Sequence, residues 1–376
     1  MTLAETKVHE NLNTGLSGWP LLIVSAAIGG VAGVLSVGVA RWLTRHGGLD
    51  SPEKHGISSI RACRLGGVLI ASYMLFTIIY HYMLNAELIF SGVSLWVLGL
   101  STGFFAIGLF EDIRGILSAR LRLVLMLGAV GILLGLNDDL LIKPVGLPMF
   151  DWLLTSLWLA VPITLLCLAF LPNAFNAADG ANGLVAGISL IILIALADAD
   201  LGALNLLLNI VAVSCVIFLA YNLVTAKVYL GDGGAYFLGA LVGGAMITAS
   251  NASELPVWYL LSLIFYPTAD FLWSIARRIY GGQSPLAADE LHLHNLVYGR
   301  IRHLTGWPIA ANTITGLGIA LIFAGVPYFI WWMNTDSAFE LAWEWLYLLQ
   351  SLAYLSLWLH LRPKIAREGL EGRDRS

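Results

Sequence analysis

Residues 152–184 read Trp152-Leu-Leu-Thr-Ser-Leu-Trp-Leu-Ala-Val-Pro-Ile-Thr-Leu-Leu-Cys-Leu-Ala-Phe-Leu171, followed by Pro172-Asn-Ala-Phe-Asn-Ala-Ala-Asp-Gly-Ala-Asn-Gly-Leu184. The first part is apolar over about 20 residues, which is the length that a membrane-spanning helix needs. The second part places an acid or amide side chain at every third position. Polar groups at membrane depth are costly and usually mark a functional site. The stretch therefore predicts an all-α polytopic membrane protein with its site at one membrane surface.

The rest of the chain has the same character. Of its 376 residues, 58% are hydrophobic and 12% are charged, whereas a soluble domain carries about 25% charged residues. No basic tract indicates a nucleic-acid partner, so none is expected. We therefore expect the chain to lie in a lipid bilayer, and we interpret residues 1–376 as a single integral membrane domain.

Hydropathy predicts about eleven spans. Their expected bounds are Trp19–Ala40, Gly66–Leu84, Gly92–Phe110, Leu121–Leu136, Trp152–Leu171, Leu184–Ala197, Leu204–Val224, Ala235–Ala249, Val257–Ile275, Ile309–Trp332 and Leu341–Leu361.

The basic residues predict the orientation of these spans. All Lys and Arg residues except Lys7 and Lys143 fall in loops after odd-numbered spans or in the C-terminal tail. Lys and Arg concentrate on the cytoplasmic side of membrane proteins. The N-terminus is therefore expected outside and the C-terminus in the cytoplasm, with the active site at the cytoplasmic face.

Four polar clusters share that face. Each has a functional interpretation and a purely structural alternative. The Asn173/Asn176/Asp179/Asn182 run suits a nucleobase, a sugar or a metal-bound phosphate, although one such residue could simply cap the next helix. Gly180 and Gly183 allow close approach of a backbone or ligand.

The second cluster is Gly231-Asp232-Gly233-Gly234, which precedes a span. It fits Mg²⁺ with a substrate pyrophosphate, because this ion takes one or two carboxylates plus phosphate oxygens and a helix N-terminus favours anions. A turn with a helix cap is the alternative.

The third cluster, Glu111-Asp112, is followed by Arg120 and Arg122, which suit a phosphate at the membrane surface. The alternative is an ordinary basic flank with a solvated acidic pair. In the fourth, Asp289, His292 and His294 open a predicted amphipathic helix at the membrane interface. Histidines two residues apart share one metal poorly on a helix, so contact with phosphate or sugar is preferred over zinc. An inert pair is the alternative.

In this order, the motifs resemble those of the polyprenyl-phosphate N-acetylhexosamine-1-phosphate transferases, glycosyltransferase family 4. The similarity covers about residues 49–302 and includes Asp50…Lys54-His55…Arg64-Leu-Gly-Gly67, Glu111-Asp112, Asn173…Gly183-Leu184, Tyr229-Leu-Gly-Asp-Gly-Gly-Ala-Tyr-Phe-Leu-Gly239 and Ser284-Pro285…Asp289…His292-Leu-His-Asn295. Glu111, Asn295 and Cys63 depart from the family pattern. These departures resemble a branch of the family that serves bacterial surface polysaccharides rather than the peptidoglycan precursor.

The resemblance implies transfer of a sugar-1-phosphate from a UDP-N-acetylhexosamine to undecaprenyl phosphate, with release of UMP. It implies a multi-pass protein of the bacterial cytoplasmic membrane that uses Mg²⁺, with Mn²⁺ as an alternative. A homodimer is common in the family.

The resemblance also implies roles for single residues. Asp232 and Asn176 would hold the metal, Asn182 would contact uracil, and Asn173 and Asp179 would shape that pocket. Asp112, with Glu111, would orient the lipid phosphate or support the metal. The expected phosphate and sugar contacts are Lys54, His55, Arg120, Arg122, Asp289, His292 and His294. Asp270 is expected to pair with Arg277.

Two other classes compete. A multispanning transporter is compatible with the composition, but transporters gather polar groups near the bilayer midplane. CDP-alcohol phosphotransferases also use membrane aspartates with Mg²⁺, but their DGxxAR spacing is absent after Asp179-Gly180.

Overall fold

The structure is a computed structural model that describes residues 31, 35, 38, 63–84, 92–226, 228–285, 287, 289–333 and 342–373. Lys54, His55 and nearly all of the first expected span lie outside these residues. Within the described part, every regular element is a helix, and Cys63 and Val228 form an isolated parallel bridge.

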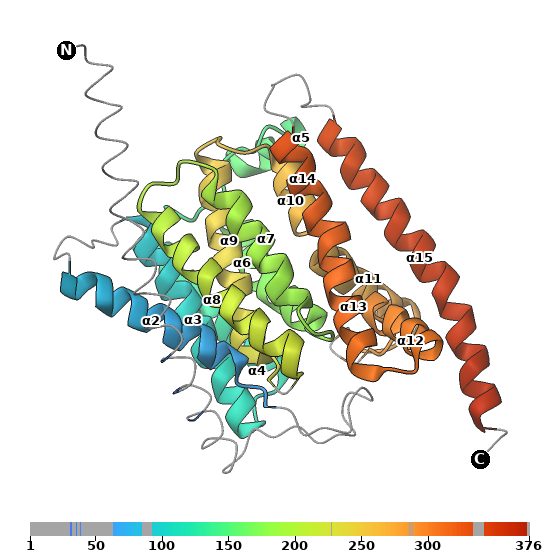
Figure 1. Cartoon of the computed structure of the whole chain (residues 1–376). Helices are drawn as coiled ribbons and strands as arrows, with labels where there is room; N and C mark the ends of the chain where they lie inside the picture. The colour runs from blue at the N-terminus through green and yellow to red at the C-terminus, as the bar shows by residue number, and fades with distance from the viewer. Residues whose placement is uncertain are drawn as a thin grey trace.

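The helices are labelled in Figure 1. Their bounds are α2 (Gly66–Leu84), α3 (Val93–Arg114), α4 (Ala119–Leu136), α5 (Pro148–Leu154), α6 (Leu157–Ala178), α7 (Leu184–Ala197), α8 (Ala203–Thr225), α9 (Gly231–Asn251), α10 (Val257–Leu263), α11 (Phe265–Tyr280), α12 (Leu293–Thr305), α13 (Pro308–Ala320), the π-helical turn η1 (Leu321–Gly325), α14 (Val326–Met333) and α15 (Ala342–Arg373).

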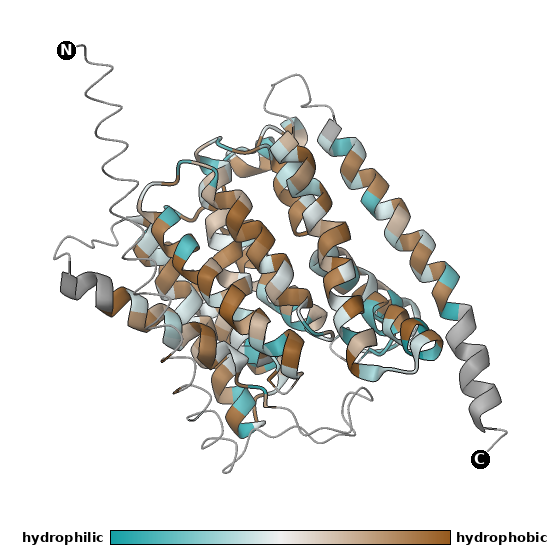
Figure 2. Cartoon of the chain, in the orientation of Figure 1, coloured by the Kyte–Doolittle hydropathy of each residue, from teal (hydrophilic) through white to brown (hydrophobic). Residues whose placement is uncertain are grey.

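In the described part, six helices are long and apolar enough to cross a membrane, and a bent pair makes a seventh. Figure 2 shows their hydrophobic residues along the length of the bundle. The protein is therefore integral to a membrane, whereas the eleven-span count and the orientation stay predictions. α2 and α7 coincide with expected segments, and the apolar stretches Gly66–Ile79 of α2 and Leu184–Ala197 of α7 are shorter than a full span.

Two expected spans are each divided into two helices. Trp152–Leu171 is split into α5 and α6, and Val257–Ile275 is split into α10 and α11, which meet at 72°. Pro267 lies in the first turn of α11. Its missing N–H removes a bond to the preceding turn and interrupts a continuous helix.

The centre of the bundle is α9, which is the most buried of the candidate spans. It packs against α2, α3, α6 and α7 (Figure 1). A Cβ added to Gly239 would lie 2.5 Å from the Pro172 backbone, so a small residue lets α6 and α9 touch. Close packing thereby brings the start of α9 to the ends of α3 and α6.

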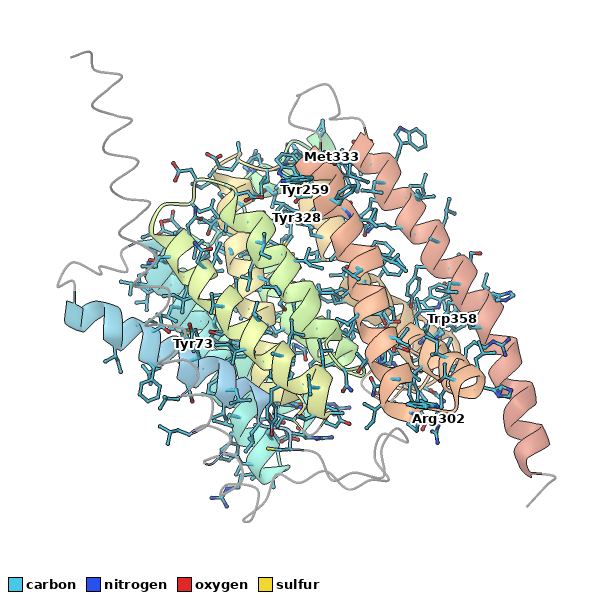
Figure 3. The ribbon with its side chains drawn as sticks, in the orientation of Figure 1. Tyr73, Tyr259, Arg302, Tyr328, Met333 and Trp358 are labelled. Atoms are coloured by element: carbon cyan, nitrogen blue, oxygen red, sulfur yellow. The ribbon has the colours of Figure 1, made fainter. Side chains whose placement is uncertain are left out.

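The C-terminal helix α15 runs beside α10, α11 and α12, and Figure 3 shows Trp358 where it passes them. At the other end of α15, an aromatic cluster joins it to α10 and α14. The Tyr259 ring stacks on Trp331 at 4.7 Å and packs at 4.7 Å against Trp343. These contacts at both ends fix α15 against the second half of the bundle.

Candidate active site

The first turn of α9 is capped by a side chain from another helix. Asp112 accepts the backbone N–H of Asp232 at 3.0 Å with one oxygen and that of Gly233 at 2.9 Å with the other. The first N–H groups of a helix have no partner within the helix. Asp112, at the end of α3, therefore fixes the position of Asp232.

Glycines make this junction sterically allowed. Gly231 has a φ of +75°, and a Cβ there would lie 1.9 Å from the Arg64 carbonyl oxygen. A Cβ on Gly108 of α3 would lie 2.5 Å from the backbone of Asp232 and Gly233, and one on Gly67 would lie 2.4 Å from Gly234. At these glycines, backbone therefore packs directly against backbone.

The Asp232 carboxylate receives side chains from two other helices. Arg122 of α4 forms an ion pair with it, and the Asn176 amide of α6 lies within hydrogen-bonding reach. Asn176 also donates to the Tyr236 hydroxyl at 3.2 Å. The Nε atom of Arg122 is buried and lacks a hydrogen-bond partner, so this guanidinium retains capacity for another anion.

Asp179, which ends α6, adds a second carboxylate to the group. It accepts the backbone N–H of Gly231 and lies near Asp232 and Arg64. Burial, together with the Asp232 charge, raises the pKa of Asp179 to about 7. The structure thus brings together five residues that are spread over 120 positions of the sequence: Asp112, Arg122, Asn176, Asp179 and Asp232.

Other expected site residues lie around this group with different contacts. Glu111 accepts the Leu117 N–H at 2.7 Å and so caps the turn after α3. Arg120 is exposed. Asn173 donates to the Ala169 carbonyl at 2.8 Å, within its own helix. Asn173 also donates to the Met126 sulfur of α4 at 3.3 Å, and Glu111 is near enough to interact with the Asp232 charge.

Asn182 is 2% exposed and is held by α13. Its backbone N–H donates to the Asn312 side chain at 2.7 Å, and its own side-chain oxygen is buried without a partner. An unsatisfied buried polar atom requires an explanation, such as a bound ligand.

A second cluster surrounds Asp270 of α11, which is 1% exposed. It accepts from His292 Nδ1 at 2.5 Å, from the Leu293 N–H at 2.9 Å and from the Tyr354 hydroxyl at 2.7 Å. The expected Asp270–Arg277 pair is wrong. Arg277 binds Asp289 at 2.5 Å instead, because His292 and Tyr354 occupy the Asp270 oxygens.

Asp289 is held by Arg277, by the Ser274 hydroxyl at 2.5 Å and by the Leu291 N–H at 2.9 Å. Burial acts to raise the pKa of Asp289, but the hydrogen bonds from Ser274 and Leu291 and the nearby Arg277 charge together outweigh it and lower this pKa below its ordinary value. These contacts fix the chain just before α12. The predicted amphipathic helix is confirmed, although it begins at Leu293 rather than Asp289.

His294 connects the two clusters. Its Nδ1 atom lies 3.0 Å from the Tyr266 hydroxyl, its ring stacks on His292 at 5.4 Å, and a Cβ on Gly180 would lie 2.1 Å from its Nε2 atom. The Asp270 cluster therefore contacts the Asn173–Gly183 segment. Burial lowers the pKa of His294 to about 4, so its imidazole is neutral at pH 7.

The donor atoms fit a hard divalent ion. Within the described residues, no three His, Cys, Asp or Glu side chains are grouped as a metal centre. Asp232, Asp179 and the Asn176 amide nevertheless supply oxygens at one place, and Mg²⁺ characteristically takes one or two carboxylates and completes its shell with substrate phosphates and water.

Sequence reasoning gave no role at the site to Asn312, Tyr266 or Tyr354. Asn312 carried a usable signal, since it is an amide inside an apolar span. Tyr266 and Tyr354 carried none, because tyrosine in a membrane helix usually packs as an aromatic residue.

Comparison with known proteins agrees with the resemblance seen in the sequence motifs. The family model for glycosyl transferase family 4 matches residues 94–250. The chain is 29% identical over 223 residues to decaprenyl-phosphate N-acetylglucosaminephosphotransferase of Mycolicibacterium smegmatis, covering 50% of this chain and 53% of that one. It is 28% identical over 270 residues to a probable undecaprenyl-phosphate N-acetylglucosaminyl 1-phosphate transferase of Bacillus subtilis, covering 68% of this chain and 71% of that one.

A third relative is the undecaprenyl-phosphate alpha-N-acetylglucosaminyl 1-phosphate transferase of Thermotoga maritima, which is 28% identical over 45% of this chain and 59% of its own length. The chain spans about half the length of several of the curated relatives that it matches. By the family-model match and these relatives together, the chain is similar to glycosyl transferase family 4 over its central part, residues 94–250.

Proposed function

We propose that this protein transfers N-acetylhexosamine-1-phosphate from a UDP-sugar to undecaprenyl phosphate. An oxygen of the lipid phosphate attacks the β-phosphorus of the donor, the bridging P–O bond breaks, and UMP leaves. The names of the relatives support a polyprenyl-phosphate acceptor and an N-acetylglucosamine-phosphate donor. The product would initiate a lipid-linked cell-surface polysaccharide.

One observation carries the proposal: carboxylates, an amide and an arginine from α3, α4, α6 and α9 meet at the first turn of α9. A helix N-terminus attracts anions, and phosphoryl transfer depends mainly on positioning and on neutralising charge. A transporter is less well supported, since transporters bind near the bilayer midplane.

Asp232 and Asn176 would hold Mg²⁺, or Mn²⁺ in its place, with Asp179 beside them. The ion, when bound, would neutralise charge on the diphosphate and orient its oxygens for the reaction. Arg122 would bind a phosphate through its fork of donors. Asn182, with its unsatisfied amide oxygen, would contact uracil, and Asn173 would border that pocket.

Asp112 would act by holding Asp232 rather than as a nucleophile, because both of its oxygens accept backbone N–H groups. This supports direct attack by the lipid phosphate, which is ionised near pH 7 and needs no strong base. Glu111 would stabilise the adjoining turn, and Arg120 would meet the lipid phosphate from the surface. Asp289, His292 and His294 would border the sugar and diphosphate, with Lys54 and His55 as further phosphate ligands.

We further propose that the site opens to the cytoplasm in a bacterial inner membrane. The distribution of Lys and Arg supports this orientation, with the N-terminus outside and about eleven spans in a single domain. The ends of α3 and α6 and the starts of α4 and α9 meet at one site, which accords with their predicted common sidedness. A homodimer is proposed from the family resemblance alone.

The test is release of radiolabelled UMP by the purified protein. We expect release from a UDP-N-acetylhexosamine only when both undecaprenyl phosphate and Mg²⁺ are present. Release without the lipid would indicate a hydrolase, and no release from any donor of a panel of UDP-N-acetylhexosamines would contradict the proposal. The same panel identifies the hexosamine.

A further inference from the structure

The Asp270 carboxylate is held by donors from two other parts of the chain. Tyr354 of α15 and the Leu293 N–H share one oxygen, while His292 binds the other. Because a carboxylate only accepts hydrogen bonds at neutral pH, the hydrogen of His292 lies on Nδ1. Its Nε2 atom is then the atom that faces away from Asp270.

The His292 ring is linked to the Asn173–Gly183 segment through His294. It stacks on His294 with the ring planes 10° apart, and His294 in turn packs on Gly180 of the Asn173–Gly183 segment. His292 therefore contacts the residue that joins the Asp270 cluster to the Asn173–Gly183 segment.

Helix α15 also holds the segment just before α12, residues 289–292, through a residue one turn after Tyr354. Trp358 donates from its indole Nε1 to the Leu291 carbonyl at 2.9 Å. Arg277 also binds this carbonyl, at 3.1 Å, and its guanidinium lies 4.9 Å from the Trp358 ring centroid. Tyr354 and Trp358 are four residues apart and thus lie on one face of the helix.

We propose that Tyr354 is a positioning residue for the donor substrate: acting through Asp270, it fixes His292 so that the Nε2 atom meets the diphosphate or sugar of the nucleotide. Trp358 holds the segment that contains His292 through its hydrogen bond to Leu291. The inference rests on the proposed function, and it gives α15, which lies outside the residues matched by the family model, a part in substrate binding.

A double-mutant cycle tests this inference through UMP release. Tyr354→Phe removes only the hydroxyl, and we expect the KM for the UDP-sugar to rise about tenfold, by analogy with the loss of an outer hydrogen-bond partner of a metal-ligating histidine. The KM for undecaprenyl phosphate should not change. His292→Asn should raise the KM for the UDP-sugar further. The double variant should have the same KM for the UDP-sugar as His292→Asn alone.

Tyr347→Phe is the matched control. Tyr347 lies two turns before Tyr354 on α15 and packs against Phe265 at 5.3 Å. Its effect should stay within twofold and combine additively with His292→Asn. Thermal unfolding in detergent identifies variants that fail to fold. Additive losses for Tyr354→Phe and His292→Asn, or an unchanged donor KM, would overturn the inference.

A measurement without turnover separates this inference from the proposed function. In protein labelled with ¹⁵N-histidine, we expect the His292 ring signals, assigned with His292→Asn, to show a protonated Nδ1. They should shift in Tyr354→Phe but not in Tyr347→Phe. Unchanged signals would overturn the positioning role even in an active enzyme. Lack of UMP release by the wild type would instead count against the proposed function alone.

Discussion

The Asp232 and Asp270 clusters both place a carboxylate beside a helix start, but they surround it differently. Asp232 stands on a helix turn enclosed by glycine backbone, and its side-chain partners are an arginine and an amide. Asp270 is enclosed by an imidazole, a backbone N–H and a phenol. Arg122 can exchange its partner for a ligand, whereas the Asp270 contacts hold three segments together. The first cluster is therefore suited to binding and the second to support.

The largest contrast is expected between Asp232→Asn and Asp270→Asn. Asp232→Asn should lower kcat about 10³-fold through lost charge stabilisation, with a change in unfolding free energy below about 1 kcal/mol because the pair is partly exposed. Asp270→Asn should destabilise the protein by about 3 kcal/mol, since it leaves buried donors poorly matched. UMP release and chemical denaturation in detergent measure the two effects. Equal destabilisation by both variants would remove the distinction.

Gly108→Ala tests the backbone contact that positions Asp232. The added Cβ would lie 2.5 Å from the Asp232 backbone, and a displacement of about 1 Å can lower kcat about 10²-fold. Gly103→Ala on the same helix is the control, as its Cβ meets nothing within 4 Å. Steady-state kinetics of both variants suffices, and similar activities would show that the contact is unimportant.

Gly180→Ala tests the contact between the clusters. Its Cβ would overlap the His294 ring, and overpacking of this kind costs about 1–3 kcal/mol. We expect the loss to appear as about a tenfold lower kcat/KM for the donor. Gly128→Ala, which adds a Cβ in open space on α4, should be neutral. A fully active Gly180→Ala would mean that the clusters are independent.

The smallest effect concerns pH and Asp179. Its folded-state pKa is about 7, above the ordinary value of 3.8. The folded state therefore binds more protons between these values, and the unfolding free energy falls as the pH rises from about 4 to about 7. In EDTA, the melting temperature should decline between pH 5 and pH 7, and Asp179→Asn should lessen this decline. An unaltered slope in the variant would assign the effect elsewhere.

The extent of sequence-based prediction differs between the two clusters for physical reasons. Local motifs carry glycines and carboxylates whose residue types indicate anion or metal binding, and the family resemblance then implied that Asp232 and Asn176 act together. The Tyr354–Asp270–His292 contacts join residues 84 and 22 positions apart. No local pattern determines such pairing, and a plausible helical spacing led to the wrong Asp270–Arg277 pair. The break between α5 and α6 and the break between α10 and α11 likewise could not be predicted, because each lies within a continuous apolar stretch.

The first turn of α9 is proposed to bind the divalent ion together with the nucleotide sugar. Titration of Mn²⁺ with purified protein and a UDP-N-acetylhexosamine, followed by electron paramagnetic resonance, tests it directly. We predict that the wild type and Tyr354→Phe each bind one Mn²⁺, given saturating nucleotide, and that Asp232→Asn binds none. Undiminished Mn²⁺ binding by Asp232→Asn would contradict the account.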